Sequence, residues 1–370
     1  MKVLTLVGTR PEIIRLSRVI SLFDEVFNHV LVHTGQNWDP ELKDVFFDDL
    51  NLRKPDFDLD VDTTSLASTL AGIFTGLEAV ILKEKPDAFL VLGDTNSALG
   101  LIIAKRMGVP TYHMEAGNRC FDENVPEETN RRIVDHAADF NCVYTEHARR
   151  NLLAEGIHPR YILHTGSPMR EVLNHYKAEI NESQILNSLS LKPTEYFLVS
   201  AHRQETVDNP VRLRELLNSL QALAKTFGHP VVVSTHPRTR KRMDELDLEG
   251  DFAGIQFLEP FGFLDYNKLQ MNARCVLSDS GTISEESSIL GFPAITLRAS
   301  IERPEALDSG SIVLADVSAD QVMRSVEFAI SSHDASSTPH DYMIDNTSHR
   351  MANFVMSTAH LYPEWAGLRG

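Results

Sequence analysis

The sequence predicts an α/β protein made of two doubly wound domains, each with a parallel sheet. Short apolar runs alternate with amphipathic stretches of ten or more residues, the pattern typical of βαβ units. The pattern stops in a polar stretch at 179–194 and then starts again. A length of 370 residues also suits two domains, at roughly 100–200 residues each. We place the domains at 1–170 and 171–345, and expect 346–370 to form a C-terminal helix that packs back on the first domain.

The first series of elements begins with an apolar strand at 2–7, followed by a well-marked helix start. Thr9 can cap this helix, Glu12 completes a capping box, and Pro11 suits the first turn. Residues 65–85 are expected to be helical because leucine and isoleucine recur there every three or four positions. The remaining elements are strands at 29–33, 88–92, 111–114 and 141–144 and helices at 95–107 and 126–139.

The second series repeats this alternation with other residues. Its strands are continuously apolar, as expected where helices cover both faces of a parallel sheet. The expected strands are 196–200, 230–235, 275–278 and 294–297, and the expected helices are 213–227, 282–290, 320–331 and 348–361.

Charge and composition exclude several classes of protein. With 35 basic and 52 acidic residues the net charge is −17, and this repulsion opposes binding to a nucleic acid. We expect no membrane span, because no apolar run approaches roughly 18 residues. The N-terminus does not resemble a signal peptide, since an arginine follows its short apolar stretch. Three cysteines at distant spacings indicate reduced thiols in a cytoplasmic protein.

Polar side chains follow the predicted strands, and this is where open α/β sheets bind ligands. Taken singly, each could be an ordinary helix cap. Taken together, carboxylates, histidines and arginines at one sheet edge fit a site better. The residues are Arg10, Asp94, Glu115, His202, His236 and Ser280.

No cofactor motif accompanies these residues. The chain has no G-x-G-x-x-G, no Walker-type phosphate loop and no H-E-x-x-H. Its fifteen histidines are scattered without convincing zinc spacing. We therefore expect neither a redox cofactor nor a metal.

Features that can bind an anion are nevertheless present. Residues 279–282 lie between a strand and a helix, where small side chains let backbone N–H groups approach a phosphate, although the same turn could be a plain cap. Glu286, about one turn further on, could accept hydrogen bonds from a ribose diol or could be a solvated helix residue. Several arginines could be surface residues or could bind phosphate in a bidentate way: Arg15, Arg203, Arg238, Arg240 and Arg303.

The segment at 115–132 carries the densest cluster of charge. Glu127 with Arg131, and Glu128 with Arg132, are spaced for helical ion pairs, which could be simple surface pairs. A helix starting at Pro126 could also bring Glu127 towards two strand-end acids, so that one carboxyl acts as an acid and another as a base. The three acids are Asp94, Glu115 and Glu127.

Seven motifs follow one another along the chain. They are GTRPE at 8–12, GDT at 93–95, EAG at 115–117, PEE-x-NR at 126–131, HR at 202–203, DSG at 279–281 with EE at 285–286, and ERPEA at 302–306. In this order they resemble the non-hydrolysing UDP-N-acetylglucosamine 2-epimerases over about residues 1–330. The resemblance implies two Rossmann-like domains with an interdomain cleft (GT-B architecture), no cofactor, a UDP-2-acetamido sugar as the partner, and a homodimer.

The resemblance also implies roles for single residues. Asp94, Glu115 and Glu127 match the catalytic carboxylates, Arg131 an arginine that orders them, and His202 an essential histidine near the diphosphate. Arg10 matches the arginine on the diphosphate side. The further residues expected at the UDP-sugar are Arg15, Arg203, His236, Ser280, Gly281, Thr282, Glu286 and Arg303.

The run GNRCFDENVPEETNRRIVDH resembles one branch of this family most closely. That branch converts UDP-2-acetamido-2,6-dideoxy-L-talose to UDP-N-acetyl-L-fucosamine for capsule or O-antigen. The alternative substrate pair is UDP-GlcNAc and UDP-ManNAc. Alternatives of another class are a glycosyltransferase of the same architecture, which would require an acceptor, and a hydrolysing relative, which would release UDP.

Overall fold

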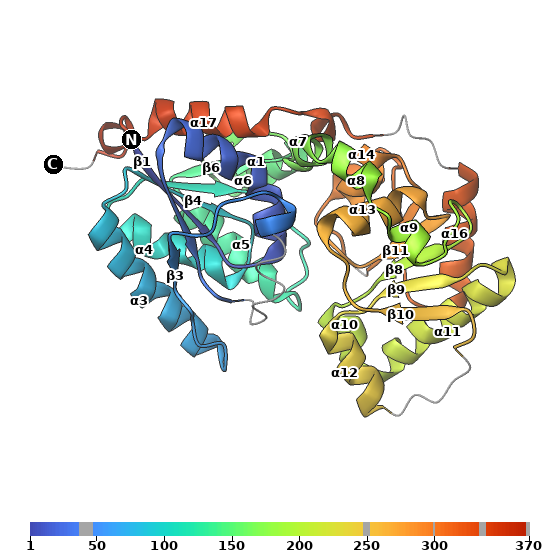
Figure 1. Ribbon diagram of the computed structural model, residues 1–370. Coiled ribbons are helices and arrows are strands. Elements are labelled where there is room, and N and C mark those ends of the chain that lie inside the picture. The colour runs from blue at the N-terminus through green and yellow to red at the C-terminus, as the bar shows by residue number, and fades with distance from the viewer. Residues whose placement is uncertain (37–46, 247–251, 299, 333–337, 368–370) are drawn as a thin grey trace. The chain divides into compact units, whose positions relative to one another are not determined.

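Parallel strands build two separate sheets, one in each of two units of the chain (Figure 1). The computed structural model describes the chain except residues 37–46, 247–251, 299, 333–337 and 368–370. Unit 1 comprises Met1–His175 and Asp341–Gly370, and unit 2 comprises Tyr176–His340. The chain thus changes unit a few residues from the boundaries that we expected.

Within the described residues, unit 1 has a seven-stranded sheet in the order β3-β2-β1-β4-β5-β6-β7. Every neighbouring pair is parallel, and β1 lies at the point where the strand order reverses. This is the switch point at which doubly wound sheets bind ligands. The strands are β1 (Lys2–Val7), β2 (Asn28–His33), β3 (Phe57–Asp58), β4 (Ala88–Leu92), β5 (Thr111–Met114), β6 (Phe140–Val143) and β7 (Ile162–His164).

Helices cover both faces of this sheet, and the last part of the chain contributes to them (Figure 1). The helix α17 packs on α1, and Thr347 at its start donates to the backbone oxygen of Thr165, the residue after β7, at 3.2 Å. The helices of unit 1 are α1 (Arg10–Val26), α3 (Leu66–Glu84), α4 (Leu101–Arg106), α5 (Pro126–Ala137), α6 (Glu146–Ala154), α7 (Met169–His175), α17 (Thr347–Thr358) and α18 (Tyr362–Trp365), with 3₁₀ turns at Asn96–Gly100, Pro159–Tyr161 and His340–Met343.

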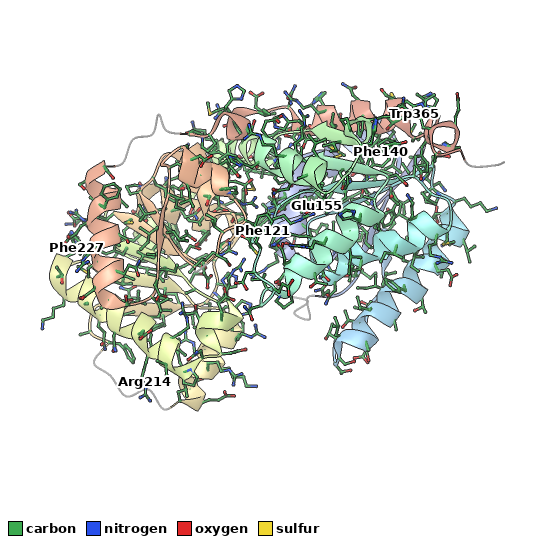
Figure 2. All side chains as sticks on the ribbon, turned by 180° about the vertical axis from the view of Figure 1, so that it is seen from behind. Phe121, Phe140, Glu155, Arg214, Phe227 and Trp365 are labelled. Atoms are coloured by element: carbon green, nitrogen blue, oxygen red, sulfur yellow. The ribbon has the colours of Figure 1, made fainter. Side chains whose placement is uncertain are left out.

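The ring of Trp365 in α18 lies against Phe140 of β6, with centroids 6.5 Å apart (Figure 2). Phe354 of α17 also packs edge-on against Phe140, at 5.3 Å. This aromatic cluster anchors the C-terminal helices on the sheet of unit 1.

The helix α3 is long and apolar enough, by length and composition alone, to cross a membrane. We expected no membrane-spanning segment, because no apolar run approaches roughly 18 residues. Leu77, Val80 and Ile81 of α3 are buried in the core of unit 1 together with Leu4 and Leu6 of β1. The apolar face of α3 is thus the face that covers the sheet.

Unit 2 has a six-stranded parallel sheet among its described residues, in the order β10-β9-β8-β11-β12-β13. Here β8 lies at the reversal of strand order. The strands are β8 (Phe197–Ser200), β9 (Val231–Ser234), β10 (Ile255–Leu258), β11 (Cys275–Ser278), β12 (Ala294–Leu297) and β13 (Val313–Ala315). The helices are α8 (Lys177–Glu182), α9 (Ile185–Ser188), α10 (Gln204–Val207), α11 (Pro210–Phe227), α12 (Pro237–Glu245), α13 (Phe263–Asn272), α14 (Ile283–Leu290), α15 (Pro304–Asp308) and α16 (Ala319–Ser332).

Two doubly wound α/β sheets confirm the predicted fold class, but some elements differ. The helix expected at 95–107 begins as a 3₁₀ turn and becomes α-helical only at Leu101. At Gly100 this segment comes close to the sheet, since a Cβ there would lie 2.9 Å from Leu6 of β1. The polar stretch at 179–194 is no bare linker, because it contains α8 and α9 of unit 2.

Candidate functional site

In unit 1, two acids project from the ends of neighbouring strands. Asp94 follows β4 and Glu115 follows β5, and these strands pair so that Leu92 lies beside Met114. A methyl group on Gly93 would lie 3.8 Å from a carboxylate oxygen of Glu115, which shows how close the two strand ends are. The structure therefore brings Asp94 and Glu115 together, as the strand-end pattern predicted.

Asp94 is held by an arginine from helix α5. The Nε of Arg131 donates to Oδ2 of Asp94 at 2.8 Å, and Asn130 donates to the Asp94 backbone oxygen at 2.9 Å. About a quarter of the Asp94 side chain is exposed (24 %), whereas Arg131 is almost buried. Helix α5 thus fixes the Asp94 carboxylate at the end of β4 while leaving part of it accessible.

Glu115 is held in a similar way by an arginine from helix α1. Arg15 forms an ion pair with Glu115, and both side chains are about nine-tenths buried. The Glu115 backbone has φ +67°, a left-handed conformation that costs a residue with a Cβ about 1 kcal/mol. Surrounding structure must therefore hold this conformation, and strained backbone of this kind is frequent at active sites.

The third predicted acid, Glu127, lies in the first turn of α5, and its catalytic role stays a prediction. Glu127 is exposed, and Arg131, its expected helical partner, contacts Asp94 and Glu128 instead. Glu128 takes the buried position on α5, where it accepts from the Cys120 backbone at 3.0 Å and from Arg131 at 2.9 Å. Its expected pair with Arg132 forms, at 3.1 Å. Burial raises the pKa of Glu128, but hydrogen bonds from Cys120 and Arg132 and the charge of Arg131 leave it lowered overall.

A further buried acid, Glu12, lies beside Asp94, and we expected it only as a helix cap. Its carboxylate accepts from the backbone N–H groups of Gly8 and Thr9, at 2.5 and 3.1 Å, and from the Thr95 hydroxyl at 2.5 Å. Burial raises the pKa of Glu12 to about 7, and the charge of Asp94 adds to the rise, while these hydrogen bonds oppose it.

We expect Glu12→Gln to remove part of the pH dependence of stability. Because the folded state raises the pKa of Glu12 from 4.5 to about 7, the wild type loses stability as pH rises through that range, by about 3 kcal/mol. Glutamine resembles the protonated acid and does not ionise. Urea unfolding of both proteins at pH 5 and pH 8 measures the effect: relative to wild type, Glu12→Gln should gain stability at pH 8. An equal difference at both pH values would contradict the assignment.

In unit 2, a buried aspartate organises the end of β8. Asp279 accepts from the backbone N–H groups of His202 and Arg203, both at 2.8 Å, and its other oxygen lies 3.2 Å from Nδ1 of His202. The His202 ring stacks on His236 at 5.7 Å. The structure thus brings His202, Arg203 and His236 together at the switch point, and it adds Asp279, whose place in the DSG motif was the available signal.

The small-residue turn after β11 leads into α14. Thr282 precedes the helix, and a Cβ on Gly281 would meet nothing within 4 Å, so this turn is open to a ligand. Ser280 and Thr282 contact each other through their hydroxyls at 2.9 Å. The helix N-terminus and the accessible backbone suit an anion.

Two predicted residues support this turn from within unit 2. Arg303 is 4 % exposed; it donates to the Gly281 backbone oxygen at 2.5 Å and pairs with Glu285 at 3.1 Å. Glu286 is buried and accepts from Gln270 at 2.7 Å. Gln270 was missed, because a buried glutamine in an apolar helix gives no sequence signal.

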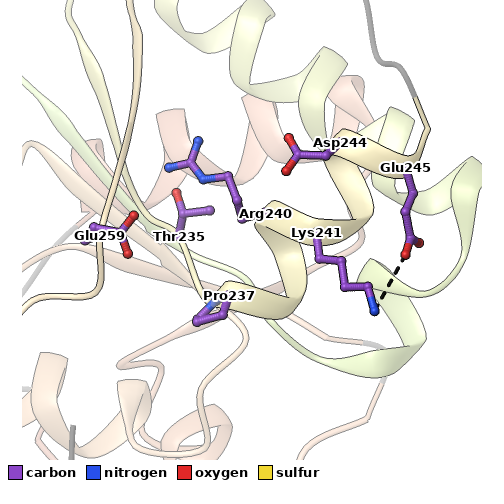
Figure 3. A pocket seen from close by; sticks show the side chains of 7 residues that line it. All are labelled: Thr235, Pro237, Arg240, Lys241, Asp244, Glu245 and Glu259. Carbon is purple, nitrogen blue, oxygen red and sulfur yellow. Dashed lines mark ion pairs between the residues drawn. The ribbon is translucent and has the colours of Figure 1, made fainter. Parts of the chain in front are cut away.

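Two other features of the described residues bear on ligand chemistry. No group of three or more His, Cys, Asp or Glu side chains that could hold a metal occurs among them. A cavity of about 400 Å³ lies along α12, where Lys241 and Glu245 pair at 3.8 Å (Figure 3). Of the arginines considered from sequence, Arg240 lines it and donates to the Phe257 backbone oxygen at 2.9 Å. The cavity is lined by Thr235, Pro237, Arg240, Lys241, Asp244, Glu245 and Glu259.

Known proteins match the chain over most of its length. The family model described as UDP-N-acetylglucosamine 2-epimerase matches residues 23–356. The UDP-N-acetylglucosamine 2-epimerase of Methanocaldococcus jannaschii is 36 % identical over 339 residues, covering 89 % of this chain and 92 % of that protein.

Solved structures also match the chain over nearly its whole length. The structure of UDP-N-acetylglucosamine 2-epimerase from Rickettsia bellii has a TM-score of 0.93 and 46 % identity, covering 100 % of both chains. That of the M. jannaschii enzyme in complex with UDP-GlcNAc and UDP has a TM-score of 0.90 and 32 % identity, covering 96 % of this chain and 99 % of that chain. A glycotransferase of kitacinnamycin, 10 % identical with a TM-score of 0.60, covers 96 % of this chain and 98 % of that chain and shares the GT-B fold alone.

Proposed function

The chain belongs to the UDP-N-acetylglucosamine 2-epimerase family and is therefore an isomerase. From this premise we propose that it inverts the configuration at C2 of a UDP-2-acetamido sugar by eliminating UDP and adding it back. The observation that carries this proposal is the pair of acids at neighbouring strand ends, Asp94 with Arg131 and Glu115 with Arg15. Two carboxylates, each kept in place by an arginine, supply the base and, once one is protonated, the acid that such a reaction needs.

The chemistry of the substrate explains why elimination is the route. The hydrogen on C2 of a UDP-2-acetamido sugar is not next to a carbonyl carbon of the ring, so direct removal and return of the proton is not feasible. One carboxylate takes the C2 proton, the C–H electrons form the C1–C2 double bond, and UDP leaves C1 with the electrons of the C–O bond. UDP then adds to C1 of the 2-acetamidoglycal while a carboxyl group delivers a proton to the opposite face of C2.

The leaving UDP needs a strong anion site, and the turn in unit 2 supplies the groups for one. In this proposal the turn at 280–282 and His202 bind the diphosphate, and Glu286 binds the ribose diol. Arg303 fixes the turn through the Gly281 carbonyl. Arg10, Arg203 and His236 complete the contacts to UDP, and Arg15 acts through Glu115.

For the sugar, we propose UDP-2-acetamido-2,6-dideoxy-L-talose, giving UDP-N-acetyl-L-fucosamine. The support is the segment at 117–136, which resembles that branch of the family. The second candidate is the UDP-GlcNAc and UDP-ManNAc pair, and it is favoured by the M. jannaschii relative, whose structure contains UDP-GlcNAc. The same resemblance supports a cytoplasmic homodimer that supplies capsule or O-antigen synthesis.

One experiment tests both the reaction and the sugar. The enzyme is incubated in D2O, without an acceptor, with either UDP-GlcNAc or the 6-deoxy-L-talo nucleotide. We expect one deuterium to appear at C2, faster in the 6-deoxy-L-talo sugar, as read by the loss of the C2 proton signal in NMR spectra.

Each other outcome contradicts a stated part of the proposal. Absence of deuterium from every UDP-2-acetamido sugar contradicts the elimination route. Faster exchange into UDP-GlcNAc contradicts the proposed sugar. Free UDP that accumulates to the amount of substrate indicates a hydrolase, and turnover only with an acceptor indicates a glycosyltransferase.

A further inference from the structure

A buried network of charged residues lies directly beneath the two strand ends that carry Asp94 and Glu115. The side chains of His113, Asp135 and Arg119 are fully buried, at 0 % exposure each. His113 belongs to β5 and Asp135 to α5, whereas Arg119 follows the Glu115 turn. The proposed reaction assigns no step to any of the three.

The network contacts the backbone on both sides of the acids. The Nε2 of His113 lies 2.7 Å from the backbone oxygen of Gly93, the residue before Asp94. Its Nδ1 lies 2.9 Å from Oδ1 of Asp135. Both ring nitrogens of His113 thus face an acceptor, one a backbone oxygen and the other a carboxylate.

The other contacts of Asp135 reach the Glu115 turn. Its two oxygens accept from the backbone N–H of Gly117, at 3.2 and 3.1 Å, and from Arg119 at 2.7 Å. Arg119 also donates to the Asn118 backbone oxygen at 2.7 Å. At its outer end Arg119 binds Glu155 through two hydrogen bonds, of 2.8 and 2.6 Å, and Glu155 is labelled in Figure 2.

These contacts coincide with unusual backbone. Gly93, Glu115 and Gly117 all have positive φ, at +76°, +67° and +81°. A glycine adopts such a conformation freely, but Glu115 does not, so the turn needs an external constraint. Buried charge pairs are weak evidence of added stability, and a role in fixing one local geometry explains their presence better.

We propose that His113, Asp135 and Arg119 are positioning residues that fix the separation of the Asp94 and Glu115 carboxylates. One aspartate bridges the two strand ends, through His113 to Gly93 and directly to Gly117, and it lies one turn along α5 from Arg131. Asp135 is thereby linked to the backbone before Asp94, to the turn after Glu115 and to the helix that carries Arg131. This inference rests on the proposed roles of Asp94 and Glu115.

The test compares two buried aspartates near opposite ends of β5. In Asp135→Asn one carboxylate oxygen is replaced by an NH2 group, which donates. The single remaining oxygen cannot accept from His113, Gly117 and Arg119 together. Asp139→Asn is the matched control: Asp139 is also buried, and it accepts from the Thr111 backbone and hydroxyl, both at 2.9 Å. Thr111 begins β5, at the end away from Glu115.

We expect Asp135→Asn to lower kcat per UDP-binding site on the order of 100-fold, with KM and the Kd for UDP changed less than about threefold. Amide hydrogen exchange at 93–95 and 115–119 should become faster in Asp135→Asn but not in Asp139→Asn. Asp139→Asn should lower the midpoint of urea unfolding while keeping kcat per site. If Asp135→Asn does not fold, His113→Gln replaces it, because glutamine can keep one of the two hydrogen bonds of His113. It should show a smaller fall in kcat per site and a smaller rise in amide exchange at the same segments.

The two readouts separate the possible failures. If amide hydrogen exchange at both segments stays at the wild-type rate in Asp135→Asn, the positioning role is overturned. Faster exchange with kcat per site unchanged overturns the link to catalysis, whereas the proposed roles of Asp94 and Glu115 fail only if their own amide variants keep full activity. A fall in kcat of the same size in Asp139→Asn shows that general loosening of unit 1 is responsible, and it also overturns the inference.

Discussion

Asp94→Asn and Glu115→Gln should each lower kcat on the order of 1,000-fold, the usual contribution of a group that transfers a proton. Neither amide can accept a proton at neutral pH, and each keeps the shape of the acid that it replaces. The Kd for UDP should change less than about threefold, because neither acid is one of the proposed UDP contacts. Turnover and deuterium incorporation at C2, measured on the same samples, check the prediction.

The control for this pair is Glu123→Gln. Glu123 is an exposed acid in the same loop region as the site, so the substitution removes one negative charge without touching the acid pair. Its kcat should stay within about twofold of wild type, as is normal for surface substitutions. Full activity in Asp94→Asn or Glu115→Gln would show that the substituted acid is neither the base nor the acid.

Gly117→Ala should destabilise unit 1 by about 3–5 kcal/mol, which combines backbone strain with overpacking. Gly117 has φ +81°, and a Cβ there would lie 2.4 Å from the backbone oxygen of Ala148. A backbone atom cannot move aside as a flexible side chain can. Trp365 packs on Phe140 of β6, so the change in the fluorescence of Trp365 during urea unfolding follows unit 1.

Gly108→Ala is the matched control for the steric part of this effect. Gly108 has φ +79°, almost the same backbone conformation, but a Cβ there would meet nothing within 4 Å. Gly108→Ala should lower the free energy of unfolding only by the cost of the backbone strain, about 1 kcal/mol. Equal losses in the two variants would show that the contact with Ala148 does not matter.

Strand-end reasoning predicted where the acids lie but not which arginine holds which acid. Because parallel strands end at one edge of a sheet, Asp94 and Glu115 could be placed together without a structure. Arg15 and Glu115 are a hundred positions apart, and Asp94 and Arg131 are almost forty apart. Such pairs depend on how α1 and α5 rotate against the sheet, which no local pattern encodes.

Within helix α5 the sequence also could not predict that Glu128, and not Glu127, is the buried acid. Successive residues of a helix differ by about 100°, so both acids border the face that carries Arg131 and Val134. The spacing alone allows either acid to lie inward. In the structure the inward set is Glu128, Arg131, Val134 and Asp135, and Ile133 is largely exposed. Contact with the sheet, and with the Cys120 backbone, decides the rotation.

The return of the chain from unit 2 to unit 1 has a consequence for biosynthesis. Unit 1 contains Met1–His175 but also Asp341–Gly370, and α17 packs on α1. A ribosome completes the whole of unit 2 before it makes α17, so the N-terminal segment of unit 1, Met1–His175, must wait with part of its apolar surface uncovered. In vivo, the unit that begins first is therefore finished last, the reverse of the usual N-to-C order of domain folding. The nascent chain is most exposed to chaperones and proteases during that interval.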